Sequence, residues 1–363
     1  MSILHDLLAK AVELGASDIH LKPAQDPYYR VSGRLVESGF SELTADDLEM
    51  IVKDILPPHL EDSFREEHEA DFSYEEDGVG RFRTNVFMAQ YIPTIAMRHV
   101  KTRVPTFNDL SLPPILEQIA LAPRGIVLLS GTTGSGKSTT LAAMIQKINT
   151  SDKRRIITME DPVEYIFPDE MSLITQREVG LDTLSFQAAL KRVMRQDPDV
   201  IMVGEMRDEL SFQAALAASE TGHLVFSTLH AGTASQAVFR LLDLFPAAER
   251  DQIRMSLTSN LYAIICQRLI PAIRGGVVPA CEILINTPTV KKLLVKNQLD
   301  VLSAAIETGS EDGMQTFNQH LYKLIKSGTI SEAEGMENAT NPEQLRMNLQ
   351  GIFLDEGKRI LAV

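Results

Sequence analysis

The sequence predicts an α/β protein whose larger part is a mainly parallel sheet, preceded by a smaller α+β domain and followed by a helical region. Two observations carry this prediction. Four apolar, strand-like runs alternate with helical segments across residues 125–230, and a glycine-rich phosphate-binding motif directly follows the first run. A length of 363 residues suits about two domains, and a hydrophobic content of 44% is enough to bury a substantial core.

The first part of the chain has the pattern of short helices and strands. Leu4 and Leu8 share one helical face, and Gly15 ends that helix. The expected helices lie at 3–14 and 44–56, and the expected strands at 18–21, 28–31, 34–36, 71–74 and 81–89. We therefore predict an α+β domain over residues 1–99. The proline-bearing stretch 100–114 is expected to link it to a second domain.

The second part, residues 115–363, alternates strands with helices. The expected strands are 126–130, 156–159, 200–203 and 224–229, and the expected helices between them are 139–149, 185–196 and 208–220. This alternation is typical of a mainly parallel sheet of the RecA type. Residues 250–270 and the region from about 287 onward are expected to be mostly helical.

Residues 131–138 form a complete P-loop, Gly-Thr-Thr-Gly-Ser-Gly-Lys-Ser. The backbone N–H groups of such a loop wrap a phosphate, Lys137 supplies charge for the β- and γ-phosphates, and Ser138 offers a hydroxyl to Mg²⁺. The helix that follows presents its N-terminus to the pyrophosphate. No Asn-Lys-x-Asp guanine motif occurs, which favours ATP over GTP. ATP and Mg²⁺ are predicted to bind through Gly131, Thr132, Thr133, Gly134, Ser135, Gly136, Lys137, Ser138 and Thr139.

Reactive side chains follow the other predicted strands of the sheet, and open α/β sheets bind ligands at those carboxyl ends. Glu205 follows the third strand, where P-loop enzymes keep an acidic group, and is expected to polarise the attacking water beside the metal. His230 follows the fourth strand and can sense the γ-phosphate, although a loop histidine is often only hydrogen-bonded. His223 lies about 23 Å of strand away from His230 and better suits a structural or subunit-boundary role. An acidic cluster suited to metal-bound water follows the second strand and consists of Glu160, Asp161 and Glu164.

Two arginines on one predicted strand are candidates for a contact in trans. Alternation with a period of two puts Arg81, Arg83 and Asn85 on one face and Phe82 on the other. A solvated polar face is the simpler interpretation. The alternative is that Arg81 and Arg83 are arginine fingers that complete a neighbouring subunit's nucleotide site. Further candidates, which could equally be ordinary ion pairs, are Arg207 and Arg240.

Composition narrows the class of protein. A net charge of −14 without a basic tract disfavours nucleic-acid binding. The two cysteines, Cys266 and Cys281, form no C-x-x-C pair, so no structural zinc site is expected and a reducing compartment is favoured. The N-terminus lacks the pattern of a signal peptide, and the longest apolar run, 261–266, is too short to span a bilayer. A cytoplasmic protein is therefore expected.

Four motifs taken together resemble the secretion-superfamily ATPases. Residues 131–139 look like their Walker A motif, 160–164 like the Asp box, 203–208 like Walker B and 221–230 like the His box. Within that group the chain most resembles the PilT-type retraction ATPases of type IV pili. The supporting segments are Gly15–Leu21, Arg81–Asn85, Asp243–Pro246 and Gly313–Phe317.

This resemblance implies a homohexameric ATPase motor that powers pilus retraction and twitching motility. Each subunit would have a PAS-like N-terminal domain and a RecA-like C-terminal domain, with ATP bound between subunits. The resemblance also implies that Glu205 is the catalytic carboxylate, that Glu164 supports the metal and water, that His230 belongs to the His box, and that Arg81 and Arg83 act in trans. An inner-membrane platform protein of the pilus is the implied partner, reached from the cytoplasmic face of that membrane.

Other members of the superfamily remain as alternatives. Assembly-type relatives carry a tetracysteine zinc site and additional N-terminal domains, and neither is found in this sequence, which favours retraction. Two segments depart from the retraction pattern: Thr289–Leu293 stands where Ala-Ile-Arg is usual, and Arg268 is more typical of assembly enzymes. A principal retraction motor, an accessory paralogue and an assembly or secretion ATPase all stay open. A nucleic-acid translocase on the same core is a remote alternative that the acidic charge disfavours.

Overall fold

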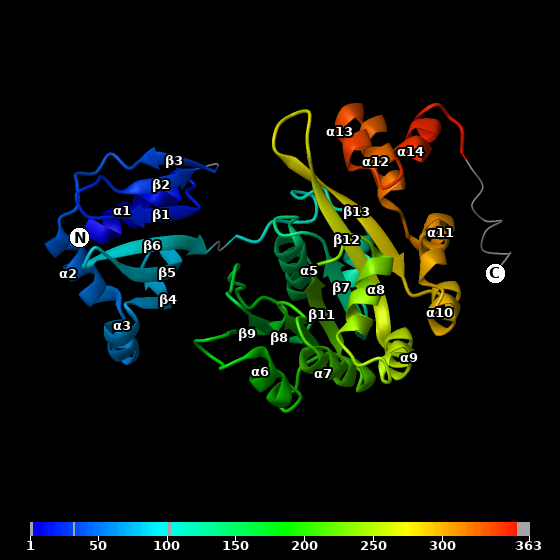
Figure 1. Cartoon of the computed structure of the whole chain (residues 1–363), viewed down its shortest axis with the longest axis horizontal. Helices are drawn as coiled ribbons and strands as arrows, with labels where there is room; N and C mark the ends of the chain where they lie inside the picture. Colours follow the sequence, from blue (N-terminus) through cyan, green and yellow to red (C-terminus); the bar gives the residue numbers. More distant parts are fainter. Residues whose placement is uncertain (1–2, 32, 101–102, 354–363) are drawn as a thin grey trace. The chain divides into compact units, whose positions relative to one another are not determined.

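The computed structural model describes residues 3–31, 33–100 and 103–353, and it divides the chain into two compact units. The first unit contains Met1–Arg103 together with Glu164–Ile166, and the second contains Val104–Val163 and Phe167–Val363. The predicted domain boundaries stay a prediction, because residues 101–102 of the expected linker and residues 354–363 lie outside the described ranges. Figure 1 shows the elements of both units with their labels.

The N-terminal unit is one antiparallel sheet with three helices. The sheet has six strands in the order β3-β2-β1-β6-β5-β4. The elements are α1 (Ile3–Glu13), β1 (Asp18–Leu21), β2 (Tyr28–Val31), β3 (Arg34–Glu37), α2 (Ala45–Ile55), α3 (Glu61–Glu67), β4 (Glu69–Glu76), β5 (Gly80–Ala89) and β6 (Ile92–Val100). Apolar side chains of α1 and α2, such as Leu7 and Leu48, are fully buried with sheet residues such as Ile19 and Phe82.

The C-terminal unit contains a seven-stranded sheet in the order β13-β12-β7-β11-β10-β8-β9. Its strands are β7 (Gly125–Ser130), β8 (Arg155–Glu160), β9 (Leu173–Glu178), β10 (Val200–Val203), β11 (Leu224–Leu229), β12 (Leu261–Pro271) and β13 (Val277–Ile285). Each neighbouring pair from β12 to β9 is parallel, and only β13 is antiparallel to its neighbour. The predicted α/β fold with a mainly parallel sheet is confirmed.

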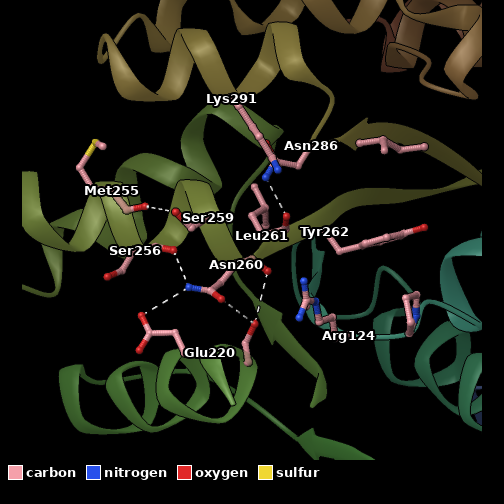
Figure 2. A pocket seen from close by; sticks show the side chains of 14 residues that line it. Arg124, Glu220, Met255, Ser256, Ser259, Asn260, Leu261, Tyr262, Asn286 and Lys291 are labelled. Carbon is pink, nitrogen blue, oxygen red and sulfur yellow. Dashed lines mark hydrogen bonds between the residues drawn. The ribbon is translucent and has the colours of Figure 1, made fainter. Parts of the chain in front are cut away.

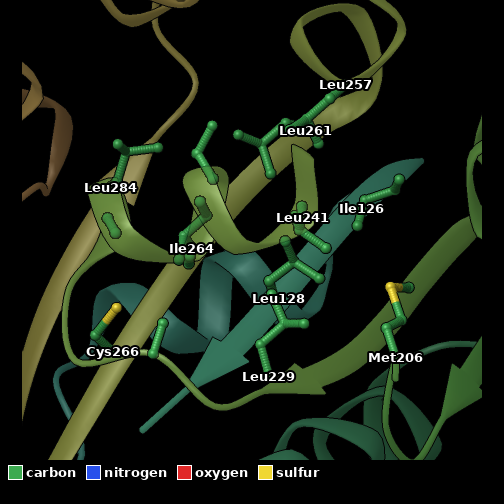
Figure 3. Close-up of a cluster of buried hydrophobic side chains, with 14 of the residues drawn as sticks. Ile126, Leu128, Met206, Leu229, Leu241, Leu257, Leu261, Ile264, Cys266 and Leu284 are labelled. Carbon is green, nitrogen blue, oxygen red and sulfur yellow. The ribbon is translucent and has the colours of Figure 1, made fainter. Parts of the chain in front are cut away.

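Helices cover this sheet and continue to the C-terminal end of the described chain. They are α4 (Ile115–Ala120), α5 (Lys137–Ser151), α6 (Phe186–Val193), α7 (Glu209–Glu220), α8 (Ala234–Asp243), α9 (Arg250–Asn260), α10 (Pro288–Val295), α11 (Leu302–Thr308), α12 (Phe317–Lys326), α13 (Glu332–Asn338) and α14 (Pro342–Leu349). Leu128, Leu229 and Ile264 of the sheet share one buried cluster with Leu241 of α8 and Leu257 of α9 (Figure 3). Burying such side chains contributes about 1.5–3 kcal/mol each.

The prediction of helix over residues 250–270 is wrong in its second half. Helix α9 ends at Asn260, and β12 runs from Leu261 to Pro271. The run is almost continuously buried, and β12 lies between β7 and β13 inside the sheet. A strand buried on both faces loses the polar–apolar alternation that distinguishes it from a helix, and this explains the error.

Within the described ranges, no helix combines the length and the apolar character that crossing a bilayer requires.

Candidate active site

The carboxyl ends of four parallel strands meet at one edge of the C-terminal sheet. In the register of the sheet, Leu229 pairs with Ser130, and Val203 pairs with both Ser227 and Met159. The P-loop therefore follows β7 at the same edge at which Glu205 follows β10, His230 follows β11 and Glu160 ends β8. This placement agrees with the expectation that ligands bind where such strands end.

The P-loop backbone forms a tight cradle in front of α5. Gly136 has φ 83° at the helix N-cap, a conformation that favours glycine, and an added Cβ there would lie 2.8 Å from the Gln267 side-chain nitrogen. An added Cβ on Gly131 would lie 2.5 Å from the Gln267 carbonyl oxygen. Lys137 is buried, and its Nζ donates to the carbonyl oxygens of Gly131 and Thr132 at 2.9 and 3.0 Å. The loop thus curves around the lysine ammonium.

Gln267 of β12 braces this loop and was not expected from the sequence. It is buried; its Oε1 accepts from Thr140 Oγ1 at 2.8 Å, and its Nε2 donates to the Ser135 carbonyl at 2.8 Å. The contact joins the loop to a strand that lies about 130 residues further along the chain. The only sequence signal is a polar amide within the apolar run of β12.

Glu205 and His230 are in direct contact. The Nε2 atom of His230 lies 3.2 Å from Oε1 of Glu205, and Arg207 Nε donates to Glu205 Oε2 at 2.8 Å. Thr228 Oγ1 donates to the Gly204 carbonyl at 2.7 Å, and Met206 is buried in the core (Figure 3). Anchors on both sides therefore fix the Glu205 backbone, while its carboxylate stays partly accessible. Arg207 is therefore part of an ion pair within the subunit, which was the alternative to a contact in trans.

The three carboxylates predicted to form an acidic cluster after β8 differ in their burial. Glu160 is buried, and its Oε1 accepts from Thr158 Oγ1 at 2.6 Å and from Gln176 Nε2 at 3.1 Å. Asp161 and Glu164 are exposed. In the part of the chain that the structure describes, no group of three His, Cys, Asp or Glu residues could hold a metal ion. A buried carboxylate needs partners nearby, and these two hydrogen bonds supply them to Glu160.

The residues present fit a bound nucleoside triphosphate with Mg²⁺. The Ser135 hydroxyl is buried in the P-loop without a hydrogen-bond partner, and the neighbouring Gly134 has open space around it, which leaves this part of the loop backbone accessible to a phosphate. Ser138 lies in the first turn of the 15-residue helix α5. Magnesium in phosphate-transfer sites is held by few protein ligands together with the phosphates, so one hydroxyl and a nearby carboxylate suffice.

The other candidate residues lie at separate places. Arg81 and Arg83 are half-buried on one face of β5, opposite the fully buried Phe82, as the alternation predicted. Arg240 is exposed near the end of α8. His223 precedes β11 at the end opposite His230 and contacts the Ala218 carbonyl at 2.9 Å. His223 and His230 therefore do not share a site, in agreement with the expectation from strand length.

A polar groove of about 730 Å³ lies at the opposite edge of the same sheet (Figure 2). It is lined at the starts of β7 and β12, among others by Gly125 and Leu261. Figure 2 shows Asn260 in a network in which its Nδ2 donates to the Ser256 carbonyl at 2.8 Å and to Glu220 at 3.4 Å. The groove is therefore separate from the P-loop edge, and its size alone does not make it the active site.

The P-loop at the end of β7, the Glu205–His230 pair beside it and the parallel sheet define a P-loop ATPase of the RecA type. A family model described as "Type II/IV secretion system protein" matches residues 1–323, so the chain belongs to this family.

Its relatives include two type IV pilus ATPases of Pseudomonas aeruginosa. The retraction ATPase PilT is 40% identical over 93% of this chain and 98% of its own length. The ATPase PilU is 39% identical over 95% of this chain and 90% of its own length. A crystal structure of the pilus retraction motor PilT with bound ADP matches with a TM-score of 0.87 and 41% identity, covering 95% and 99% of the two chains. The chain is a PilT-like ATPase, and this prediction is confirmed.

Proposed function

We propose that this chain is the motor subunit that hydrolyses ATP to power retraction of a type IV pilus. The observation that carries the proposal is one edge of the sheet, where the P-loop lysine and the Glu205–His230 pair lie together, in a chain that matches a retraction ATPase over 93% of its length. ATP hydrolysis requires a phosphate cradle and an aligned water, and these residues can supply both.

The residues divide the work as follows. The loop 131–139 binds the triphosphate, with Lys137 neutralising the β- and γ-phosphates and Ser138 as the hydroxyl ligand of Mg²⁺. Magnesium, when bound with the nucleotide, offsets phosphate charge. Glu205 polarises the attacking water, and His230, at 3.2 Å, holds that carboxylate and senses the γ-phosphate.

Carboxylates beyond Glu205 have a smaller part in this proposal. Glu164 and Asp161 are exposed and could support water around the metal, whereas Glu160 is engaged by Thr158 and Gln176 and acts through the structure of the β8 end. The support for Glu164 is the resemblance of 160–164 to the Asp box of the family.

We further propose that the active form is a homohexamer in which Arg81 and Arg83 act on a neighbouring subunit's nucleotide. The support is the family resemblance and the polar face that both arginines occupy on β5. The exposed Arg240 is a weaker candidate for the same contact. The motor would work at the cytoplasmic face of the inner membrane on a platform protein of the pilus.

An accessory motor subunit is a second candidate function. The observation that favours it is the segment Thr289–Leu293, which departs from the Ala-Ile-Arg that is usual in retraction enzymes. The two candidates share the ATPase chemistry and differ in the cell: loss of a principal motor abolishes retraction, whereas loss of an accessory subunit reduces its force.

Two substitutions test the chemistry in the purified protein. Lys137→Ala should abolish ATP turnover, and Glu205→Gln should bind ATP while turning over at least about tenfold slower, the scale of a lost catalytic group. Glu220→Gln makes the same chemical change at the opposite edge of the sheet and should leave turnover unchanged. Normal hydrolysis by either of the first two variants would contradict the site.

Deletion of the gene in its source organism tests the cellular role. Cells that accumulate surface pili without retracting them support a principal retraction motor. Retraction that persists with reduced force supports the accessory role, and cells without pili would show that the chain drives assembly instead.

A further inference from the structure

A single buried hydroxyl joins the P-loop strand to the histidine loop. Ser130 is the last residue of β7, directly before Gly131, and its side chain is fully buried. Its Oγ donates to the Ala231 carbonyl at 2.8 Å and accepts from the Ala231 N–H at 2.9 Å. Both backbone groups of one residue are thus satisfied by one side chain, across 101 residues of sequence.

Ala231 lies next to a residue of the candidate active site. Ala231 directly follows His230, whose Nε2 lies 3.2 Å from Glu205 Oε1. The segment continues into α8, where the Ala234 N–H donates to the buried Glu282 at 2.8 Å. Between the end of β11 and the start of α8, Ser130 therefore fixes the residue next to the histidine.

We propose that Ser130 is a positioning residue for ATP hydrolysis, which holds His230 against Glu205 and ties that pair to the P-loop. This inference rests on the proposed function. A shift of the loop by about 1 Å can slow a reaction on the order of 100-fold even when substrate binding is intact. Loss of the hydroxyl would leave the N–H and carbonyl of Ala231, which is itself buried, without their partner, so the loop would move to recover hydrogen bonds.

The first test compares serine variants in the full-length assembled protein. We expect Ser130→Ala to lower kcat about tenfold or more while KM for ATP changes less than about twofold, because the P-loop itself is retained. Ser130→Thr keeps the hydroxyl and should restore most of the turnover. If Ser130→Ala does not fold, Ser130→Val carries the test, since valine has nearly the shape of threonine without the hydroxyl and should lower kcat alone, whereas Ser130→Thr should not.

Ser172 offers a matched control. It is also buried, and its Oγ donates to the Asp152 carbonyl at 2.7 Å and accepts from the Arg154 N–H at 3.2 Å. The residues that make these contacts lie just before the first residues of β8 and β9, at the edge of the sheet opposite the P-loop. Ser172→Ala should lower stability without changing kcat. An equal loss of kcat in both alanine variants would overturn the proposal.

A double-mutant cycle shows whether Ser130 acts through the histidine. In a His230→Ala background, Ser130→Ala should lower kcat by less than about a further twofold, because the group that it positions is already gone. A full additional loss would overturn the inference. Its failure differs from failure of the proposed function: an active Ser130→Ala beside an inactive Glu205→Gln refutes the inference alone, whereas an active Glu205→Gln refutes the site itself.

Discussion

Acidification should destabilise the C-terminal unit through one buried histidine. His320 lies on α12 and is buried, and its Nδ1 accepts a hydrogen bond from the Cys281 N–H of β13 at 2.8 Å. Burial, with a smaller contribution from the nearby Lys323 ammonium, lowers the pKa of His320 from 6.5 to about 4. Protonation would also turn the accepting nitrogen into a donor that faces another donor.

The sign follows from the two pKa values. Between pH 6.5 and about pH 4 the unfolded chain binds a proton at His320 that the folded chain does not bind, so stability falls as the pH falls. The contribution is fully present above pH 6.5 and fully lost below about pH 4. The whole shift corresponds to about 3 kcal/mol, and about 2 kcal/mol of it is lost by pH 5.

Thiol labelling during urea unfolding measures the free energy of unfolding of the C-terminal unit, which contains His320. Cys266 and Cys281 are the two cysteines of the chain, and both are buried in β12 and β13. The variant His320→Asn keeps an acceptor that does not titrate, and His59→Asn, at an exposed position, is its control. Between pH 7.5 and pH 5, wild type should lose about 2 kcal/mol more than His320→Asn. Equal losses would refute the reasoning.

Two further predictions concern the nucleotide. Gln267→Leu removes the hydrogen-bond partner of Thr140 and of the Ser135 carbonyl. The affinity for a fluorescent ATP analogue should therefore fall about tenfold, the scale of one or two buried hydrogen bonds. An unchanged Kd would contradict the proposal that Gln267 supports the P-loop. Arg83→Ala should lose ring-dependent turnover, and mixing it with Lys137→Ala should restore part of it, because one subunit supplies the pocket and the other the arginine. Mixed rings as inactive as either parent would exclude a contact in trans.

The parallel strands could be predicted because burial on both faces leaves a continuous apolar signature. The bounds of β10 and β11 agree with the sequence prediction, and those of β7 agree to within one residue. The edge strand β9, Leu-Ile-Thr-Gln-Arg-Glu, was missed because three of its six residues are strongly polar. The central strand β6 was missed although Ile95 and Met97 are buried, since Pro93 near its start is unusual in a central strand.

In the candidate active site, residues of short motifs could be predicted from the sequence, whereas residues that act through distant contacts could not. The position of the P-loop, Glu205 and His230 at one edge of the sheet could be predicted, because each follows a recognisable strand and belongs to a short motif. Ser130 and Gln267 could not, because each acts through contacts more than 100 residues away that only folding brings together. A lone polar side chain in an apolar run is the one signal such residues leave, since a buried polar group needs a partner.

The same strand explains one of the departures from the retraction pattern. Gln267 of β12 turns toward the P-loop, whereas the next residue, Arg268, turns toward the C-terminal helices. Its guanidinium donates to the Asn338 carbonyl at 2.6 Å and lies 4.0 Å from the ring centre of Phe317, so it holds α12 and α13 to the sheet. The hydrogen bond and the ring contact of this arginine are both made to the C-terminal helical region. Arg268 therefore does not distinguish an assembly enzyme from a retraction enzyme. The distinction depends on the match to the retraction ATPase along the whole chain.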